Sequence, residues 1–260
     1  MSEPAAGTDA FAVAPYTASE VRFHLLGALL NAAVVLSGAV WLGSRWSSSP
    51  PAWPGVALSA LAALYLADLV SGLLHWAFDT WFDEEIGFLR RMVLQVREHH
   101  VYPQRIFCIS FWHDAGTLSW IGLVLVGPLV LWAMVTGAGL AASYAVCTAV
   151  LFDLMLVTML EFHKCGHRPN NPRWVRLLQK SGLLLSVRHH MRHHAGNHDL
   201  NYCLINGWAD RTLGRLGLFR ALEWGVARAS GARPQRNDHD WLRRFGLPVI
   251  GRRRGRRPAA

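Results

Sequence analysis

Hydrophobic runs divide the chain into four segments that are long enough to cross a bilayer. The mostly apolar windows are 23–43, 54–78, 118–136 and 140–162. Each has about the 20 residues that a membrane-spanning helix needs. A turn-rich link over 46–53 joins the first two windows, and a short glycine-containing link over 136–139 joins the last two. The pattern therefore predicts two helical hairpins in a membrane.

The positions of the basic residues predict how these hairpins are oriented. Of the 26 Lys and Arg residues, only Arg45 lies between the two windows of either hairpin. The positive-inside rule then puts both termini, the 79–117 loop and the region after 162 in the cytoplasm. We expect a multi-pass protein of a bacterial inner membrane. Its net charge of +9 is explained by this topology, so we expect no nucleic-acid partner.

Composition agrees with a membrane protein that has short polar tails. The chain is 52% hydrophobic and 17% charged, against about 25% charged residues in soluble domains. We expect an acidic disordered tail over 1–22, a membrane domain over 23–245 and a basic tail over 246–260. The basic tail either contacts anionic lipid or serves only topology and solubility. The stretch Pro172–Val187 is amphipathic, and it either lies in the membrane interface or packs on the cytoplasmic region.

Most of the 13 histidines fall into clusters beside the cytoplasmic ends of the spans. The clusters are Asp68/His75/Asp79, Glu98-His99-His100, His163-x-x-x-His167 and His189-His190-x-x-His193-His194-x-x-x-His198. Two imidazoles four residues apart on a helix can bind one metal ion, although one such pair alone is weak support for a site. Four clusters on one membrane face are much stronger, because ionisable groups there are functional by default.

The number of imidazoles indicates two metal ions. A single zinc ion takes four ligands, or three and a water, which leaves most of these histidines unused. A histidine-dominated double site at a membrane surface is typical of integral-membrane desaturases and hydroxylases. Asp79, Glu98 and Glu161 are candidate acceptors that orient the ligating rings. We therefore predict an all-α integral membrane protein with four transmembrane helices and a His-rich cytoplasmic helical cap.

Several motifs, in order, resemble the Kua/CarF family of membrane lipid desaturases. They are His75-Trp-x-x-Asp79-Thr-Trp81, Arg97-Glu-His-His100-x-x-Pro103, His163-Lys-x-x-His167, Pro172-Arg-Trp-Val175 and His189-His-x-x-His-His-x-x-x-His198. The resemblance covers about residues 65 to 245. It implies an iron-dependent enzyme that uses O2 and an external electron donor, ferredoxin-like or cytochrome b5-like, to desaturate a membrane lipid.

The resemblance also implies roles for individual residues. The iron ligands it implies are His75, His99, His100, His163, His167, His189, His190, His193, His194 and His198. Asp79 is expected as a ligand or as a partner of a ligand, and Glu98 as a second catalytic carboxylate. The chain departs from the family after Pro103, where the stretch before His113-Asp114 is longer and more apolar, so the role of His113 is open.

The substrate and the reaction also stay open between related alternatives. Ligands at the cytoplasmic ends of the spans lie near the lipid headgroups, so the reacting bond should be close to a headgroup. We favour vinyl-ether formation in plasmanylethanolamine. The alternatives are desaturation of an acyl chain near its carboxyl end, or hydroxylation by the same kind of site. A metal transporter is the remote alternative, because it would need ligands near the bilayer midplane.

Overall fold

The computed structural model describes residues 16–83, 85–87, 89–195, 197–235 and 238. The predicted basic tail, 246–260, lies outside these residues. So does most of the predicted N-terminal tail, and the first helix already begins at Ala18. Every regular element in the described part of the chain is helical.

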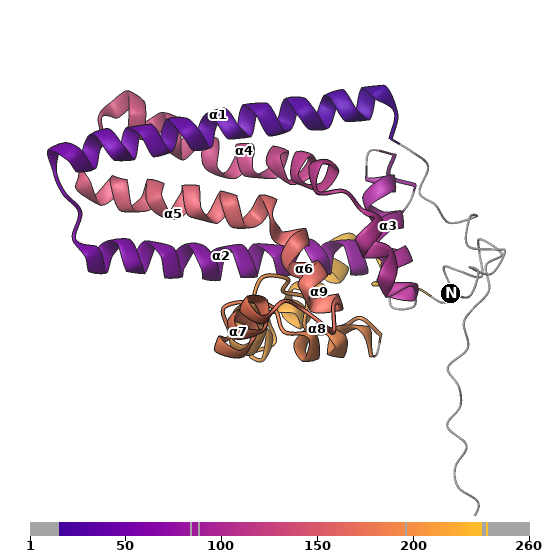
Figure 1. The fold of residues 1–260 in the computed structure, drawn as a ribbon. Coiled ribbons are helices and arrows are strands. Elements are labelled where there is room, and N and C mark those ends of the chain that lie inside the picture. Colours follow the sequence, from indigo (N-terminus) through magenta and orange to yellow (C-terminus); the bar gives the residue numbers. More distant parts are fainter. Residues whose placement is uncertain (1–15, 84, 88, 196, 236–237, 239–260) are drawn as a thin grey trace, which may run out of the picture.

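In the described residues, four long apolar helices form the membrane body. They are α1 (Ala18–Ser48), α2 (Trp53–Thr80), α4 (Phe111–Thr136) and α5 (Leu140–Val157). Each is long and apolar enough to cross a bilayer. The four helices run side by side, and the links α1–α2 and α4–α5 lie together at one end (Figure 1). The two predicted hairpins are present, and the chain is an all-α integral membrane protein.

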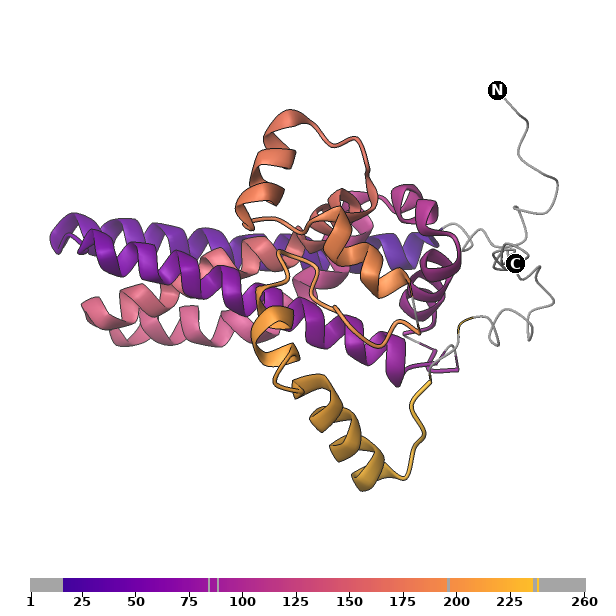
Figure 2. The ribbon, with the colours of Figure 1, turned by 90° about the horizontal axis from the view of Figure 1, so that it is seen from below.

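Shorter helices form a cap at the opposite end of this body. They are α3 (Arg90–Val101), the 3-10 helix η2 (Pro103–Cys108), α6 (Met159–His167), α7 (Arg173–Ser181), α8 (Val187–His194), the π-helical turn η3 (Asp210–Gly214) and α9 (Leu218–Ser230). Seen from below, α7 and α9 lie on opposite sides of α2 (Figure 2). The clustered histidines lie in this cap or at the adjoining end of α2, as predicted.

Local sequence signals explain several helix boundaries. Thr17 and Glu20 form a capping box at the start of α1, which satisfies two backbone N–H groups that the helix leaves unpaired. Pro54 stands in the first turn of α2, where its missing N–H costs nothing. Gly137 ends α4 with φ +59°, a conformation that glycine adopts without strain.

The fourth predicted span, 140–162, is two helices instead of one. The backbone leaves the helical path at Thr158, whose side-chain hydroxyl donates to the carbonyl of Leu154 at 2.7 Å. A hydroxyl that bonds back to the preceding turn competes with the regular helix pattern. The break separates α5 from α6, and it carries His163 and His167 into the cap. The third span also begins earlier than predicted, at Phe111.

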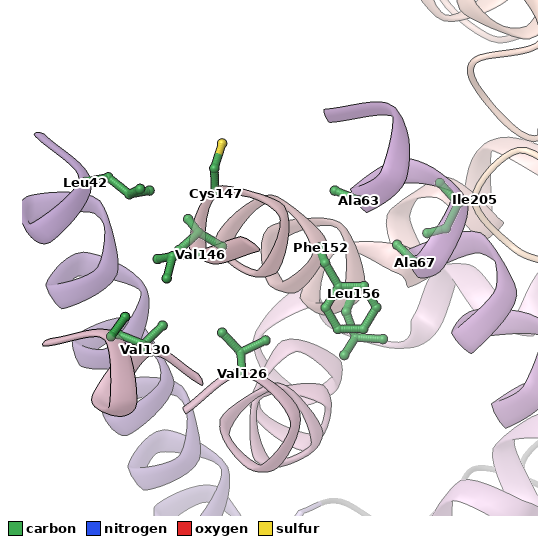
Figure 3. Packing of buried hydrophobic residues seen from close by; sticks show 12 residues of the cluster. Leu42, Ala63, Ala67, Val126, Val130, Val146, Cys147, Phe152, Leu156 and Ile205 are labelled. Carbon is green, nitrogen blue, oxygen red and sulfur yellow. The ribbon is translucent and has the colours of Figure 1, made fainter. Parts of the chain in front are cut away.

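The four long helices pack through small and branched side chains. Val126 and Val130 of α4 meet Val146 and Val150 of α5 in a buried cluster that also includes Ala63 and Ala67 of α2 (Figure 3). A Cβ atom on Gly122 would lie 1.8 Å from Oδ1 of Asp153, so only glycine fits there. Small residues at such contacts let membrane helices approach closely.

Both intramembrane aspartates have structural partners. Asn31 of α1 donates to Asp153 of α5 at 2.7 Å, which joins two helices inside the body. Asp68 of α2 accepts backbone N–H groups of residues 205, 206, 207 and 209 at 2.8–3.2 Å. These bonds hold the 202–209 loop against α2. In the described residues neither carboxylate faces the histidine clusters, which weakens the transporter alternative.

The amphipathic stretch Pro172–Val187 contains the short helix α7, which ends at Ser181 because Gly182 adopts φ +78°. The exposed face of α7 carries Trp174, Leu177 and Leu178. Leu184 follows the helix and is buried, so it does not belong to this face. An exposed tryptophan and leucines on a short helix beside α2 favour a position in the membrane interface.

Candidate metal centre

Five imidazoles from three cap helices gather around one point. They are His99 of α3, His163 and His167 of α6, and His190 and His194 of α8. Their ring nitrogens lie within 4.8 Å of one another. The Nε2 atoms of His163, His167 and His190 approach at 2.7–3.2 Å, and His194 Nε2 is 3.1 Å from that of His190. This set is called the five-histidine group.

A second group lies next to it and contains a carboxylate. Its members are His75 and Asp79 of α2, His100 of α3 and His193 of α8. The oxygens of Asp79 lie 3.4 Å, 3.6 Å and 3.5 Å from the Nε2 atoms of the three imidazoles in that order. Both oxygens are buried and accept no hydrogen bond from any described residue. This set is called the carboxylate group. A buried carboxylate without a donor is costly unless a cation compensates it.

The histidine doublets divide between the two groups. His99 belongs to the five-histidine group and His100 to the carboxylate group, and the same holds for His194 and His193. Consecutive residues of a helix point about 100° apart, so a doublet serves two sites and not one. The ring centres of His99 and His100 are 4.7 Å apart, which makes the two groups direct neighbours.

In several rings Nδ1 donates a hydrogen bond to a backbone carbonyl, and this bond turns Nε2 of the same ring toward the ligand group. The Nδ1 atoms of His75, His99 and His193 each lie 2.9 Å from a backbone carbonyl, those of Tyr202, Val96 and Leu200. A carbonyl only accepts, so Nδ1 carries the hydrogen and Nε2 keeps a free lone pair. His100 Nδ1 likewise faces an acceptor, Asp238, and the Nε2 atoms of His100 and His193 lie 3.1 Å apart, where two facing lone pairs repel. A metal ion between such nitrogens removes that repulsion. A hydrogen bond from the other ring nitrogen to a protein acceptor is typical of histidines that bind metals.

Burial keeps these imidazoles neutral. It lowers the pKa values of His99, His163, His190 and His193 well below the ordinary value, and neighbouring imidazoles add to the effect. Burial also lowers the pKa of His167 to about 4. At neutral pH these rings are therefore uncharged. Neutral imidazole is the form that binds metals.

Asp238 is a site residue that the sequence did not reveal. It accepts from His100 Nδ1 at 2.7 Å and pairs with Arg97 at 2.6 Å, and His198 Nδ1 lies 3.3 Å away. Arg97 also donates to Gln235 and to the carbonyl of Phe82. Asp238 stands 138 residues beyond His100 in a stretch without periodicity. The signal available was the buried arginine of the Arg-Glu-His-His motif, which needs a carboxylate partner.

Other predicted residues lie outside both groups. His189 points to Asp210 at 2.8 Å, and Glu98 pairs with Arg105 at 3.2 Å. His198 stacks on His100 with ring centres 4.0 Å apart, and forms a smaller set with His100 and Asp238. The residues outside the groups also include His113, which bonds Ser110 and stacks on Tyr16, and Glu161, which pairs with Lys164.

A mostly apolar cavity of about 100 Å³ adjoins the two groups. It lies between α2, α3, α4 and α6, at the cap end of the membrane body. His99 and His163 of the five-histidine group line it, and so does His75 of the carboxylate group. Leu74, Phe78, Met92, Val96, Ile106, Leu118, Met159 and Leu160 form much of the remaining wall. The cavity therefore suits a hydrocarbon chain and brings it to both groups.

Comparisons with known proteins agree with this site. The family model described as "Lipid desaturase domain" matches residues 64–237, which include every member of both groups. Plasmanylethanolamine desaturase of Myxococcus xanthus is 32% identical over 196 residues, 75% of this chain and 69% of that protein. Plasmanylethanolamine desaturase 1 of Mus musculus is 27% identical over 206 residues, 78% and 74% of the two chains.

A plant relative is similar at the same level. Fatty acid desaturase 4, chloroplastic, of Arabidopsis thaliana is 31% identical over 192 residues, 72% of this chain and 57% of that protein. No solved structure matches the chain. The family model covers more than half of the sequence and contains both histidine groups, so this chain belongs to the lipid desaturase domain family.

Proposed function

We propose that this protein is a di-iron, O2-dependent membrane lipid desaturase that forms a double bond close to the lipid headgroup. One observation carries the proposal. Two adjacent ligand groups, one of five histidines and one of three histidines and an aspartate, meet the same apolar cavity at the end of a membrane bundle. A hydrocarbon chain bound there would lie beside both groups.

The donor set fits two ions of a metal that prefers imidazole. Two nitrogens that bind one ion at about 2.1 Å each lie at most about 4.2 Å apart. The Nε2 distances in the five-histidine group are 2.7–3.2 Å. Imidazole suits iron among other metals, and the unpaired carboxylate of Asp79 supplies a negative charge to the second ion. When bound, two iron ions would supply the redox chemistry that breaks unactivated C–H bonds with O2.

The roles of the residues follow from the two groups. His99, His163, His167, His190 and His194 would hold one ion. The second ion would be held by His75, Asp79, His100 and His193. Backbone carbonyls and Asp238 fix the orientation of the second set through Nδ1. His189, which bonds Asp210, and Glu98, which pairs with Arg105, would support the ligand helices and not contact the ions.

The substrate is a lipid whose reacting carbons lie near its headgroup. The cavity lies at the cap end of the helices, which supports a position near the lipid headgroups and not at the bilayer midplane. We propose plasmanylethanolamine as substrate and a vinyl ether as product, because two relatives carry that name at 27% and 32% identity. Acyl-chain desaturation is the second candidate, because a fatty acid desaturase is 31% identical. In both reactions the reacting carbons lie near the lipid headgroup.

The distribution of basic residues supports a cytoplasmic position for the site. Both hairpin links lie at the end far from the cap, and the one basic residue near them is Arg45, in the last turn of α1. The positive-inside rule then puts the cap and both termini on the cytoplasmic side of a bacterial inner membrane. A donor protein of the ferredoxin or cytochrome b5 kind could reach the cap there.

Lipid mass spectrometry tests the function. Membranes of a host that expresses the chain and contains plasmanyl lipids should gain species two hydrogens lighter that are cleaved by acid, as vinyl ethers are. Acid-stable species of the same mass would identify acyl desaturation. A mass gain of one oxygen would identify hydroxylation. Unchanged lipids in a host that supplies iron, O2 and an electron donor would refute the proposal.

A further inference from the structure

Helix α8 has two faces of opposite character. His190 and His193 point inward and are buried, and they belong to the two ligand groups. Arg188, Met191 and Arg192 are exposed. Residues at intervals of three and four lie on one face of a helix, so these three side chains form a single outer surface. It is called the α8 outer face.

The α8 outer face is the nearest outer surface to the ligands that α8 carries. Helix α8 contributes ligands to both groups, so a partner that rests on its outer face is one helix away from each of them. An α-helix with its side chains is about 10–12 Å across. In Figure 1, α8 lies at the lower edge of the molecule, and no labelled helix lies below it. Arg188, Met191 and Arg192 are exposed, so the face is open to a partner.

The charge of this face suits an acidic protein. In the described part of the chain, no carboxylate pairs with Arg188 or Arg192. Met191, on the same face as the two arginines, is 39% exposed. Arginines around a small apolar centre are typical of surfaces that bind a charged partner briefly.

The membrane is a less suitable occupant of the face. The helix that offers lipid an apolar surface is α7, where Trp174 is 64% exposed and Leu177 is 59% exposed. The exposed residues of α8 are two arginines and one methionine. Such a face stays in water, and it meets a soluble partner.

The reaction of the proposed function requires such a partner. Desaturation removes two hydrogens from the lipid, and the four-electron reduction of O2 to two water molecules takes two further electrons and two protons. The lipid is oxidised by two electrons, and an external carrier must supply the other two one at a time, with protons from water. The sequence has four cysteines and no C-x-x-C pair for a cluster of its own.

We propose that the α8 outer face is the docking site for an acidic one-electron carrier protein, which passes electrons through α8 to the ligand groups. This inference rests on the proposed function, and it names the surface and the charge of the partner. Contacts of this kind are small and depend on salt, because exposed charges act mainly on the rate of encounter.

The test is a comparison of charge reversals in purified, iron-loaded enzyme in lipid nanodiscs. The donor is an acidic [2Fe–2S] ferredoxin, reduced by NADPH through its reductase, and the product is measured by lipid mass spectrometry. We expect the double variant Arg188→Glu, Arg192→Glu to raise the KM for ferredoxin at least tenfold at low salt, with a smaller effect at high salt. Arg228→Glu, the same change near the end of α9, should leave the KM unchanged.

Two further measurements separate docking from damage to the site. Iron content, and the rate of reduction by dithionite, a small reductant that needs no docking surface, should match wild type. Arg188→Glu alone also tests the face, because neither of its sequence neighbours belongs to a ligand group.

Each remaining result has one meaning. The inference is overturned if the double variant and Arg188→Glu both keep the wild-type KM, or if Arg228→Glu raises it as much. If wild-type enzyme desaturates no lipid with either reductant, the proposed function itself fails, and the docking site fails with it.

Discussion

Asp79 offers the sharpest test of the metal centre, because its replacement should act in opposite directions on the metal-free and the metal-loaded protein. In the structure its two oxygens are buried, accept no hydrogen bond from any described residue, and lie 3.4–3.6 Å from three imidazole nitrogens. In the change Asp79→Asn the shape is kept. The carboxylate charge is lost, and an N–H donor is gained that one of the facing Nε2 lone pairs can accept.

The magnitude follows from the cost of unpaired buried groups. Leaving a buried acceptor unsatisfied costs about 1–3 kcal/mol, so metal-stripped Asp79→Asn should be more stable than metal-stripped wild type by about that amount. At about 2–4 °C for each kcal/mol in a chain of this size, the melting temperature should rise by several degrees. The loaded protein should instead lose the ion of the carboxylate group, and iron should fall from about two to about one per chain. Desaturation should fall at least about tenfold.

The assays are thermal unfolding of the chelator-treated protein, metal analysis of the reconstituted protein, and lipid product analysis. Asp83→Asn is the matched control, because Asp83 only accepts the N–H of Glu85 in an exposed turn. Its effect should stay within about 0.5 kcal/mol. The reasoning is refuted if metal-stripped Asp79→Asn is less stable than wild type and the reconstituted variant still binds two irons.

Three further predictions follow from the same geometry. His193→Ala and His194→Ala should each leave about one iron per chain, because the two residues belong to different ligand groups. Metal analysis measures the iron content. If both variants keep two irons, neither histidine is an iron ligand. Asp238→Asn should weaken iron binding by about 10- to 100-fold, since it orients His100, and equal affinity by chelator competition would contradict that role. An impermeant thiol reagent applied from outside should label a cysteine introduced at Ser48 and not one at Ala195, and the reverse pattern would invert the topology.

The sequence by itself determined the membrane body and the composition of the site. Length and apolarity predict spans without reference to any partner, because each helix satisfies its own backbone in lipid. The spacing of His163 and His167 likewise predicts two ligands on one helix face, a local property that survives folding. The histidine doublets predicted a site with many ligands, and the number of imidazoles predicted two metal ions.

Tertiary structure alone decided how the ligands are divided and what supports them. The angles at which the helices α2, α3, α6 and α8 pack are not encoded in sequence spacing. The assignment of His99 and His100 to different groups therefore follows only from the folded structure. The break at Thr158 depends on one side-chain hydrogen bond in a run whose hydropathy is continuous. Asp238 reaches His100 across 138 residues, and no local pattern marks a contact that the folded chain creates.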